Sequence, residues 1–228
     1  MEQQPPLRHH GTVVMVAGTV DLTELMAALR NDRPVFHSEA DFQHGFAWAL
    51  HRLDASVNVR LEVPQDNGER LDVLAFADQG WTAIELKYFT APWSGTSPEG
   101  EVFKLRDHAA SDLARLGFIN DICRLEKLCR RHGHPATGLA VMLTNSRSLW
   151  SEPARRPTRD AQFRIHAGRT VTGTLRGAPI PTSTFRTNEP WPAPIRWSGT
   201  TTPRRPARTA SSDGSPPVWI AASGESAA

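Results

Sequence analysis

Three consecutive strand signals in the first half of the chain constrain its fold more than any other feature. In residues 57–63 the odd positions are apolar and the even positions are polar, which is the period of a half-buried strand. Residues 71–77 and 81–89 form two further apolar or alternating segments. Turn-forming Asp-Asn-Gly at 66–68 and Asp-Gln-Gly at 78–80 separate the three segments. The pattern predicts three strands in succession joined by short turns.

Helical signals lie on both sides of these strands. Residues 21–30 predict a short helix, and a stronger helix begins after Ser38, whose position before Asp41 resembles a capping box. Its apolar stripe has helical spacing, and Glu39 lies on that stripe, where a carboxylate is unexpected. The stripe consists of Phe42, Phe46, Ala49, Leu50 and Leu53. Residues 90–101 predict a loop, 103–131 a long and mostly buried helix, and 139–143 a central strand.

The domain organisation follows from the length and the composition of the ends. A chain of 228 residues forms one domain with a substantial core. Residues 1–15 are polar and are expected to be disordered, and 16–177 are expected to form the domain. Nine of the 18 prolines fall in residues 178–228, so this segment is expected to be a disordered tail. Residues 163–165 and 170–175 are expected to form a further hairpin.

Charge, cysteine content and hydropathy indicate which partners and which cellular compartment to expect. Residues 1–123 carry 10 Lys and Arg against 18 Asp and Glu, whereas 124–186 carry 12 against 3. A basic surface attracts phosphates and an acidic cluster attracts metal ions, although solvated surface charge explains the asymmetry as well. With two cysteines a disulfide scaffold is excluded, which favours a reducing compartment such as the cytoplasm. No apolar run approaches the ~20 residues that span a bilayer, so no membrane association is expected.

Four charged residues occupy positions that packing alone does not explain. Glu39 lies on the inner face of its helix, and Asp72 interrupts an apolar strand. Glu85 and Lys87 share one face of the third strand. Buried charges are costly unless they pair or bind a metal. Their convergence at one end of the sheet would provide a site for a hard divalent cation.

These residues make the chain resemble the PD-(D/E)XK nuclease superfamily, which has the restriction-endonuclease-like fold. The resemblance covers about residues 35–145 and rests on Asp72, on Ile84-Glu85-Leu86-Lys87 and on Glu39 in the preceding helix. It implies an α/β fold with an αβββαβ core, a mixed central sheet flanked by helices. The proline that precedes the Asp in many members is absent before Asp72. Residues after 145 form a basic extension outside the family pattern.

The resemblance implies a metal-dependent nuclease that hydrolyses phosphodiester bonds. Asp72, Glu85 and the backbone carbonyl of Leu86 would hold Mg²⁺, or Mn²⁺ as the alternative, with Glu39 as a further candidate ligand. Lys87 would orient the attacking water and offset charge on the phosphorus. Arginines between 124 and 176 would contact nucleic acid, with DNA favoured over RNA, and a homodimer remains open.

Two other functional hypotheses are compatible with the sequence. The chain could be a non-catalytic nucleic-acid-binding or scaffold protein that retains the same fold, or an ordinary α/β interaction protein whose tail binds partners. Glu85 and Lys87 could instead form a structural ion pair on a solvated sheet face. On the long helix, Asp112, Arg115 and Asp121 could reach the site, but a role as ordinary surface residues is equally compatible with their spacing.

Overall fold

The computed structural model describes most of the chain up to residue 151 and several shorter segments beyond it. The described residues are 13–66, 68–97, 99–108, 110–132, 136–151, 160–166, 171–175, 195–201 and 218–225.

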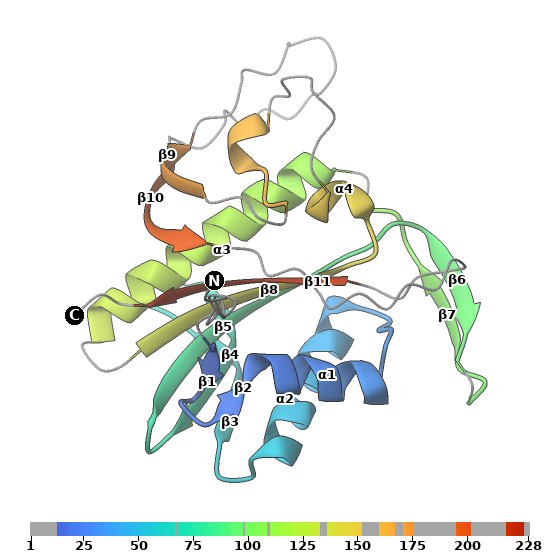
Figure 1. Ribbon diagram of the computed structural model, residues 1–228, viewed down its shortest axis with the longest axis horizontal. Helices are drawn as coiled ribbons and strands as arrows, with labels where there is room; N and C mark the ends of the chain where they lie inside the picture. The colour runs from blue at the N-terminus through green and yellow to red at the C-terminus, as the bar shows by residue number, and fades with distance from the viewer. Residues whose placement is uncertain are drawn as a thin grey trace, which may run out of the picture.

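A five-stranded mixed sheet forms the centre of the molecule (Figure 1). Its strand order is β11-β8-β5-β4-β3. The bounds are β3 Asn58–Pro64, β4 Arg70–Ala77, β5 Gly80–Phe89, β8 Ala136–Thr144 and β11 Val218–Glu225. Strands β3, β4 and β5 form an antiparallel meander, β8 runs parallel to β5, and β11 runs antiparallel to β8. The three strands expected from the turn signals are therefore present and adjacent.

Helices cover both faces of this sheet. Helices α1 (Leu22–Asp32) and α2 (Glu39–Leu53) lie on one face, and α3 (Ser111–His132) lies on the other (Figure 1). The alternation of β5 explains the arrangement, because Ile84, Leu86 and Tyr88 pack in the core cluster that contains α1 and α2. Ala83 packs in the second cluster, which contains the apolar side chains of α3. No helix of the described residues is long and apolar enough to cross a membrane.

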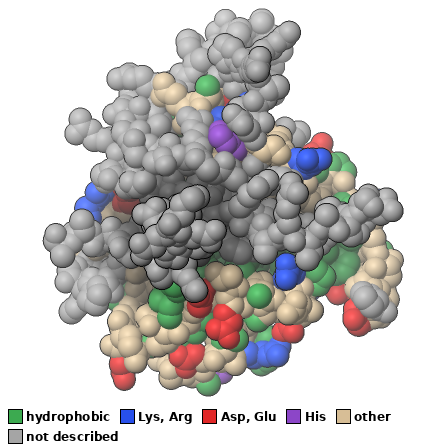
Figure 2. Space-filling view, in the orientation of Figure 1, with side chains coloured by type: hydrophobic (Ala, Val, Ile, Leu, Met, Phe, Trp, Pro, Cys, Tyr) green, Lys and Arg blue, Asp and Glu red, His purple; other side chains and the backbone are tan. Residues whose placement is uncertain are grey.

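Shorter elements complete the described structure. They are β1 Met15–Val16, β2 Val20–Asp21, β6 Trp93–Thr96, β7 Val102–Leu105, α4 Arg147–Trp150, a 3₁₀ turn Ala161–Phe163, β9 Val171–Leu175 and β10 Ile195–Thr201. The pairs β1–β2, β6–β7 and β9–β10 are all antiparallel. The β6–β7 hairpin, which follows β5 and precedes α3 in the chain, extends from one side of the molecule (Figure 1). In the described part of the face viewed in Figure 2, acidic side chains are interspersed with a few Lys and Arg side chains.

Several expected boundaries are wrong. Residues 102–105 form strand β7 and not the start of a helix, because their apolar residues Phe103 and Leu105 alternate and pair with β6 in the expected loop. Strand β9 pairs with β10, so the expected hairpin with residues 163–165 does not form. Met15, which fell within the expected disordered N-terminus, lies in β1, and residues 1–12 lie outside the described ranges.

The expected disordered tail is also corrected in part. Strands β10 and β11 lie inside residues 178–228, and β11 is hydrogen bonded to β8 along eight residue pairs. A segment with many prolines can still contribute strands where a run without proline faces an unpaired sheet edge. The remaining residues of this segment lie outside the described part of the chain.

Candidate active site

The candidate site lies where β4 and β5 separate. The last paired residues of this ladder are Val73 and Ile84. Beyond them the Leu86 amide donates to Asp72 Oδ2 at 2.7 Å, and the Tyr88 amide donates to Glu39 Oε2 at 2.9 Å. Two carboxylates therefore replace the β4 carbonyls as partners of β5. Because these amides are two residues apart on one strand, the two carboxylates lie along the same edge of β5.

Glu39 reaches the sheet from the first turn of α2. The Ser38 side chain caps this helix by accepting the Asp41 amide at 3.1 Å, as its position in the sequence predicted. Glu39 is an exposed residue and does not lie among the apolar side chains of α2. Its carboxylate nevertheless contacts β5, so the helix places one acid at the separated edge of the sheet.

Glu85 lies on the face of β5 that is covered by α3, opposite the face that packs against α1 and α2. The residue is only 3% exposed, and its Oε1 lies 2.6 Å from Arg124 Nη2. The pKa of Glu85 is raised to about 8, first by burial and then by the negative charge of Asp72, although Arg124 opposes the shift. The negative charge of Asp72 therefore acts on Glu85, while Arg124 is the residue that contacts the Glu85 carboxylate directly.

Lys87 joins this group from the same strand face as Glu85. Its Nζ lies 3.3 Å from Asp121 Oδ2 on α3. Burial lowers the pKa of Lys87, but Asp121, Glu39 and Asp72 outweigh it and raise the pKa above the usual lysine value. The side chain is therefore an ammonium at neutral pH, and it contacts Asp121 while Glu39 and Asp72 act on it through their charge.

Asp121 and Arg124 complete the site from α3. Asp121 is buried, and Arg124 Nη2 lies 3.1 Å from its Oδ1. Burial raises the pKa of Asp121 above its usual value, against the opposing effects of Lys87 and Arg124. The sequence offered Asp121 as a weaker candidate, whereas Arg124 was only one of several arginines expected to bind nucleic acid. No local pattern gives the rotation of α3 against the sheet, so the contact between Arg124 and Glu85 could not be read from the sequence.

Gln43 and Glu62 support Asp72 from its other side. The buried Gln43 side chain donates from Nε2 to the Asp72 backbone carbonyl at 2.7 Å and to Glu62 Oε1 at 3.1 Å. Glu62 has a φ of 52°, a conformation that side-chain-bearing residues rarely adopt, and it interrupts the β3–β4 register opposite Asp72. Sequence reasoning missed Gln43, although its spacing of four residues from Glu39 puts both on one helix face.

The remaining helix candidates have a different role. Arg115 is buried and pairs with Asp160 at 2.5 Å, and it also donates to the Ser148 carbonyl, so it fastens α3 to the following segments. Asp112 acts on Arg115 electrostatically. Of the other arginines expected to bind nucleic acid, Arg130 pairs with Glu126 and Arg164 with Asp160. Arg155, Arg156, Arg159, Arg169 and Arg176 lie outside the described residues.

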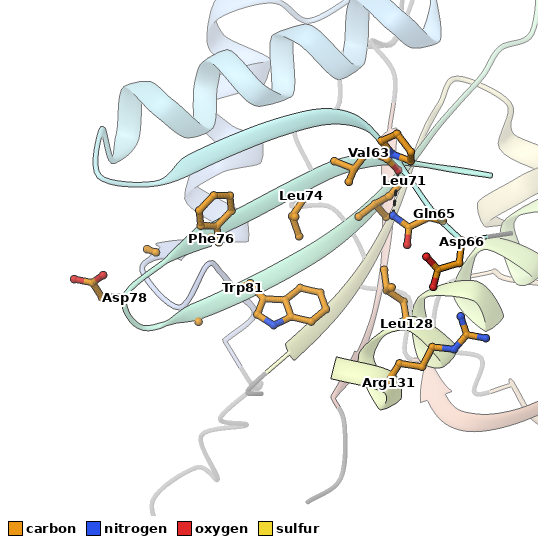
Figure 3. A pocket seen from close by; sticks show the side chains of 13 residues that line it. Val63, Gln65, Asp66, Leu71, Leu74, Phe76, Asp78, Trp81, Leu128 and Arg131 are labelled. Atoms are coloured by element: carbon orange, nitrogen blue, oxygen red, sulfur yellow. Dashed lines mark hydrogen bonds between the residues drawn. The ribbon is translucent and has the colours of Figure 1, made fainter. Parts of the chain in front are cut away.

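A separate hollow lies further along the same helix. It has a volume of about 770 Å³ and is lined by β3, β4, β5 and the last turns of α3. Trp81 from β5 and Leu128 and Arg131 from α3 face it (Figure 3). Glu39, Asp72, Glu85 and Lys87 do not line this hollow. Arg131 lies about two helical turns beyond Arg124 on α3.

The donors at the separated edge fit a hard divalent cation by their chemistry. In the described residues no group of three or more His, Cys, Asp and Glu side chains is arranged to hold a metal ion. Magnesium needs fewer protein ligands, because it commonly uses one or two carboxylates and keeps several waters. Asp72 and Glu85 supply two carboxylates, and the Leu86 carbonyl points to the same side as the Leu86 amide that Asp72 accepts.

Comparisons of this chain with protein-family models, with characterised proteins and with solved structures find no match.

Proposed function

We propose that this protein is a divalent-metal-dependent nuclease of the restriction-endonuclease-like fold that acts in the cytoplasm on phosphodiester bonds, with DNA favoured over RNA. The observation that carries the proposal is the gathering of Asp72, Glu85 and Lys87 where β4 and β5 separate. The order of α2, the three-stranded meander, α3 and the parallel strand β8 agrees with the αβββαβ core of that superfamily. The free cysteines Cys123 and Cys129 agree with a reducing compartment.

Each proposed role follows from the position of the side chain. Asp72, Glu85 and the Leu86 carbonyl would hold Mg²⁺ or Mn²⁺, with Glu39 as a further candidate at the same edge. When bound, such a cation polarises a phosphoryl oxygen and lowers the pKa of a coordinated water. Lys87 remains charged, so its ammonium can orient the attacking water and stabilise negative charge that develops on the phosphate.

Incubation of supercoiled plasmid with Mg²⁺, with Mn²⁺ and with EDTA tests this proposal. We expect nicking with either cation and none with EDTA. The variants Asp72→Asn and Lys87→Ala should each lose about a hundredfold to a thousandfold in rate. Asn is preferred to Ala at position 72, because Ala would leave the Leu86 amide without its acceptor.

Matched controls separate catalysis from folding. Lys104 is an exposed lysine on β7, and Glu24 is an exposed acid on α1, so Lys104→Ala and Glu24→Gln should retain full nicking. The melting temperature of Asp72→Asn should hold or rise, because the substitution removes a charge that repels Glu85. Equal nicking by wild type, Asp72→Asn and Lys87→Ala would refute the site assignment.

A second candidate is a non-catalytic nucleic-acid-binding or scaffold protein with the same fold. Arg124 and Lys87 favour it, because these two cations already compensate Glu85 and Asp121 without a metal. This alternative predicts retention of DNA that does not depend on divalent cations, together with the absence of nicking under every condition above.

A further inference from the structure

Arg124 occupies a position that the proposed function does not require. Its guanidinium bridges two buried acids through Nη2, which lies 2.6 Å from Glu85 Oε1 and 3.1 Å from Asp121 Oδ1. Its Nη1 lies 3.8 Å from Oε2 of Glu69, the residue just before β4. Arg124 therefore links the interior of the site to an exposed acid at its rim.

The contact with Glu85 has an electrostatic cause. Ionisation of a carboxylate that is 3% exposed is costly, and the Arg124 guanidinium at 2.6 Å favours the ionised form of Glu85 when no metal is bound. A divalent cation bound to Glu85 would supply the same compensation and would repel the guanidinium. Arg124 and the cation therefore compete for one carboxylate.

The surroundings of Arg124 allow it to leave. Its side chain is 31% exposed, and Glu69 at the rim, whose side chain is 46% exposed, lies within reach of the guanidinium. A guanidinium moved toward the rim can bind phosphate, because its planar donors match phosphate oxygens.

We propose that Arg124 is an internal counter-ion that a divalent cation displaces from Glu85, and that the displaced guanidinium then binds a phosphate of the substrate. This inference rests on the proposed nuclease function. The displacement accounts for the ion pairs that Arg124 forms with Glu85 and Asp121. It also makes cation binding and nucleic-acid binding reinforce each other.

A Mn²⁺ titration tests whether the cation displaces Arg124 from Glu85. The electron paramagnetic resonance signal of free Mn²⁺ measures how much of the ion is bound. Arg124→Gln should bind Mn²⁺ roughly tenfold more tightly than wild type, because the competing charge is gone. Arg124→Lys, which keeps the charge on a shorter side chain, should fall between them and remains informative if Arg124→Gln does not fold. Arg131→Gln, a control on the same helix, should match wild type. Equal Mn²⁺ affinity in wild type, Arg124→Gln and Arg124→Lys would overturn the proposal.

Fluorescence anisotropy of a labelled DNA duplex tests whether the displaced guanidinium binds phosphate. Binding is measured in the presence and in the absence of Ca²⁺, which replaces Mg²⁺ in this experiment. Wild type should bind the duplex more tightly when Ca²⁺ is present, and Arg124→Gln should lose that gain despite its tighter Mn²⁺ binding. A full Ca²⁺-dependent gain in Arg124→Gln would overturn the phosphate-binding role.

The two proposals fail in distinguishable ways. If wild type binds Mn²⁺ and nicks plasmid but Arg124→Gln has unchanged Mn²⁺ affinity, only the counter-ion role is wrong. If neither wild type nor either Arg124 variant binds Mn²⁺, both the nuclease function and the counter-ion role are wrong. Mn²⁺ binding that appears only in the Arg124 variants would support the counter-ion role.

Discussion

Acidic side chains do structural work at the candidate site as well as offering ligands. Asp72 and Glu39 accept main-chain amides of β5 that a longer β4 would otherwise accept. An unpaired buried amide costs about 1–3 kcal/mol, so each acid stabilises the separated edge of the sheet. The same two contacts orient one oxygen of each carboxylate toward the backbone. At the residue scale, the opening of the sheet and the placement of the acids are one feature.

The two cysteines give a pH-dependent prediction at this scale. Burial raises the pKa of Cys123 and of Cys129 to about 11. Unfolded thiols ionise near their model value of 9.0, so between these values the unfolded chain loses protons that the folded chain keeps. Stability therefore falls as the pH rises, and we expect the free energy of unfolding to drop by roughly 2 kcal/mol from pH 8 to pH 10.

Urea titrations at pH 8, 9 and 10 measure this dependence. The double variant Cys123→Ala/Cys129→Ala should show a shallower decline over the same interval. Part of the slope remains in that variant, because Tyr88 and Lys87 also have raised pKa values and contribute with the same sign. A wild-type slope no steeper than that of the double variant would contradict the prediction.

At the scale of elements, local periodicity predicted which side chains share a face of each strand, but not which residues of other elements contact that face. The alternation in residues 81–89 placed Glu85 and Lys87 on one face, and the structure finds both beside α3. The helix that supplies Asp121 and Arg124 was expected to begin near 103, but it begins at Ser111. Residues 102–105 alternate too briefly for local pattern to separate a strand from a helix, and pairing with β6 decides between them.

Helix glycines give a prediction at the same scale. A Cβ at Gly45 in α2 would lie 2.8 Å from Cε1 of the buried Phe36 ring, whereas a Cβ at Gly117 in α3 would meet nothing within 4 Å. Helix propensity alone favours Ala over Gly by about 1 kcal/mol at both positions. Gly117→Ala should therefore stabilise the protein by up to about 1 kcal/mol. Gly45→Ala should destabilise it by about 1–2 kcal/mol, because displacement of the ring outweighs the propensity gain.

Chemical denaturation of the two variants beside wild type compares these effects directly. The pair shares its chemistry and its helical setting, so the difference reports the packing between α2 and Phe36. A stabilising Gly45→Ala would mean that the Phe36 ring can shift without cost.

At the scale of the whole molecule, the C-terminal strand closes one side of the sheet. Composition suggested a disordered tail from residue 178, yet Val218–Glu225 pairs with β8 from Thr144 to Thr137. Local sequence could not reveal this pairing, because a strand separated from its partner by more than 70 residues leaves no short-range signal. The succession of α2, β3, β4 and β5 was readable because its turns and helix cap are local, whereas the β6–β7 hairpin before α3 was not expected.

The last prediction concerns this closing strand. A chain that ends at Thr201 retains β10 but lacks β11, so β8 becomes an edge strand with unpaired amides and carbonyls. Its melting temperature should fall by about 5 °C or more, and light scattering after size exclusion should detect self-association through the new edge. A control that lacks only residues 226–228, beyond β11, should match the full chain in both measurements. A truncated chain that stays monomeric and melts with the full chain would show that β11 contributes little to stability. With a stable truncation, plasmid nicking could then be measured on the shorter chain, because β5 and α3, which carry Glu85, Lys87 and Arg124, remain in it.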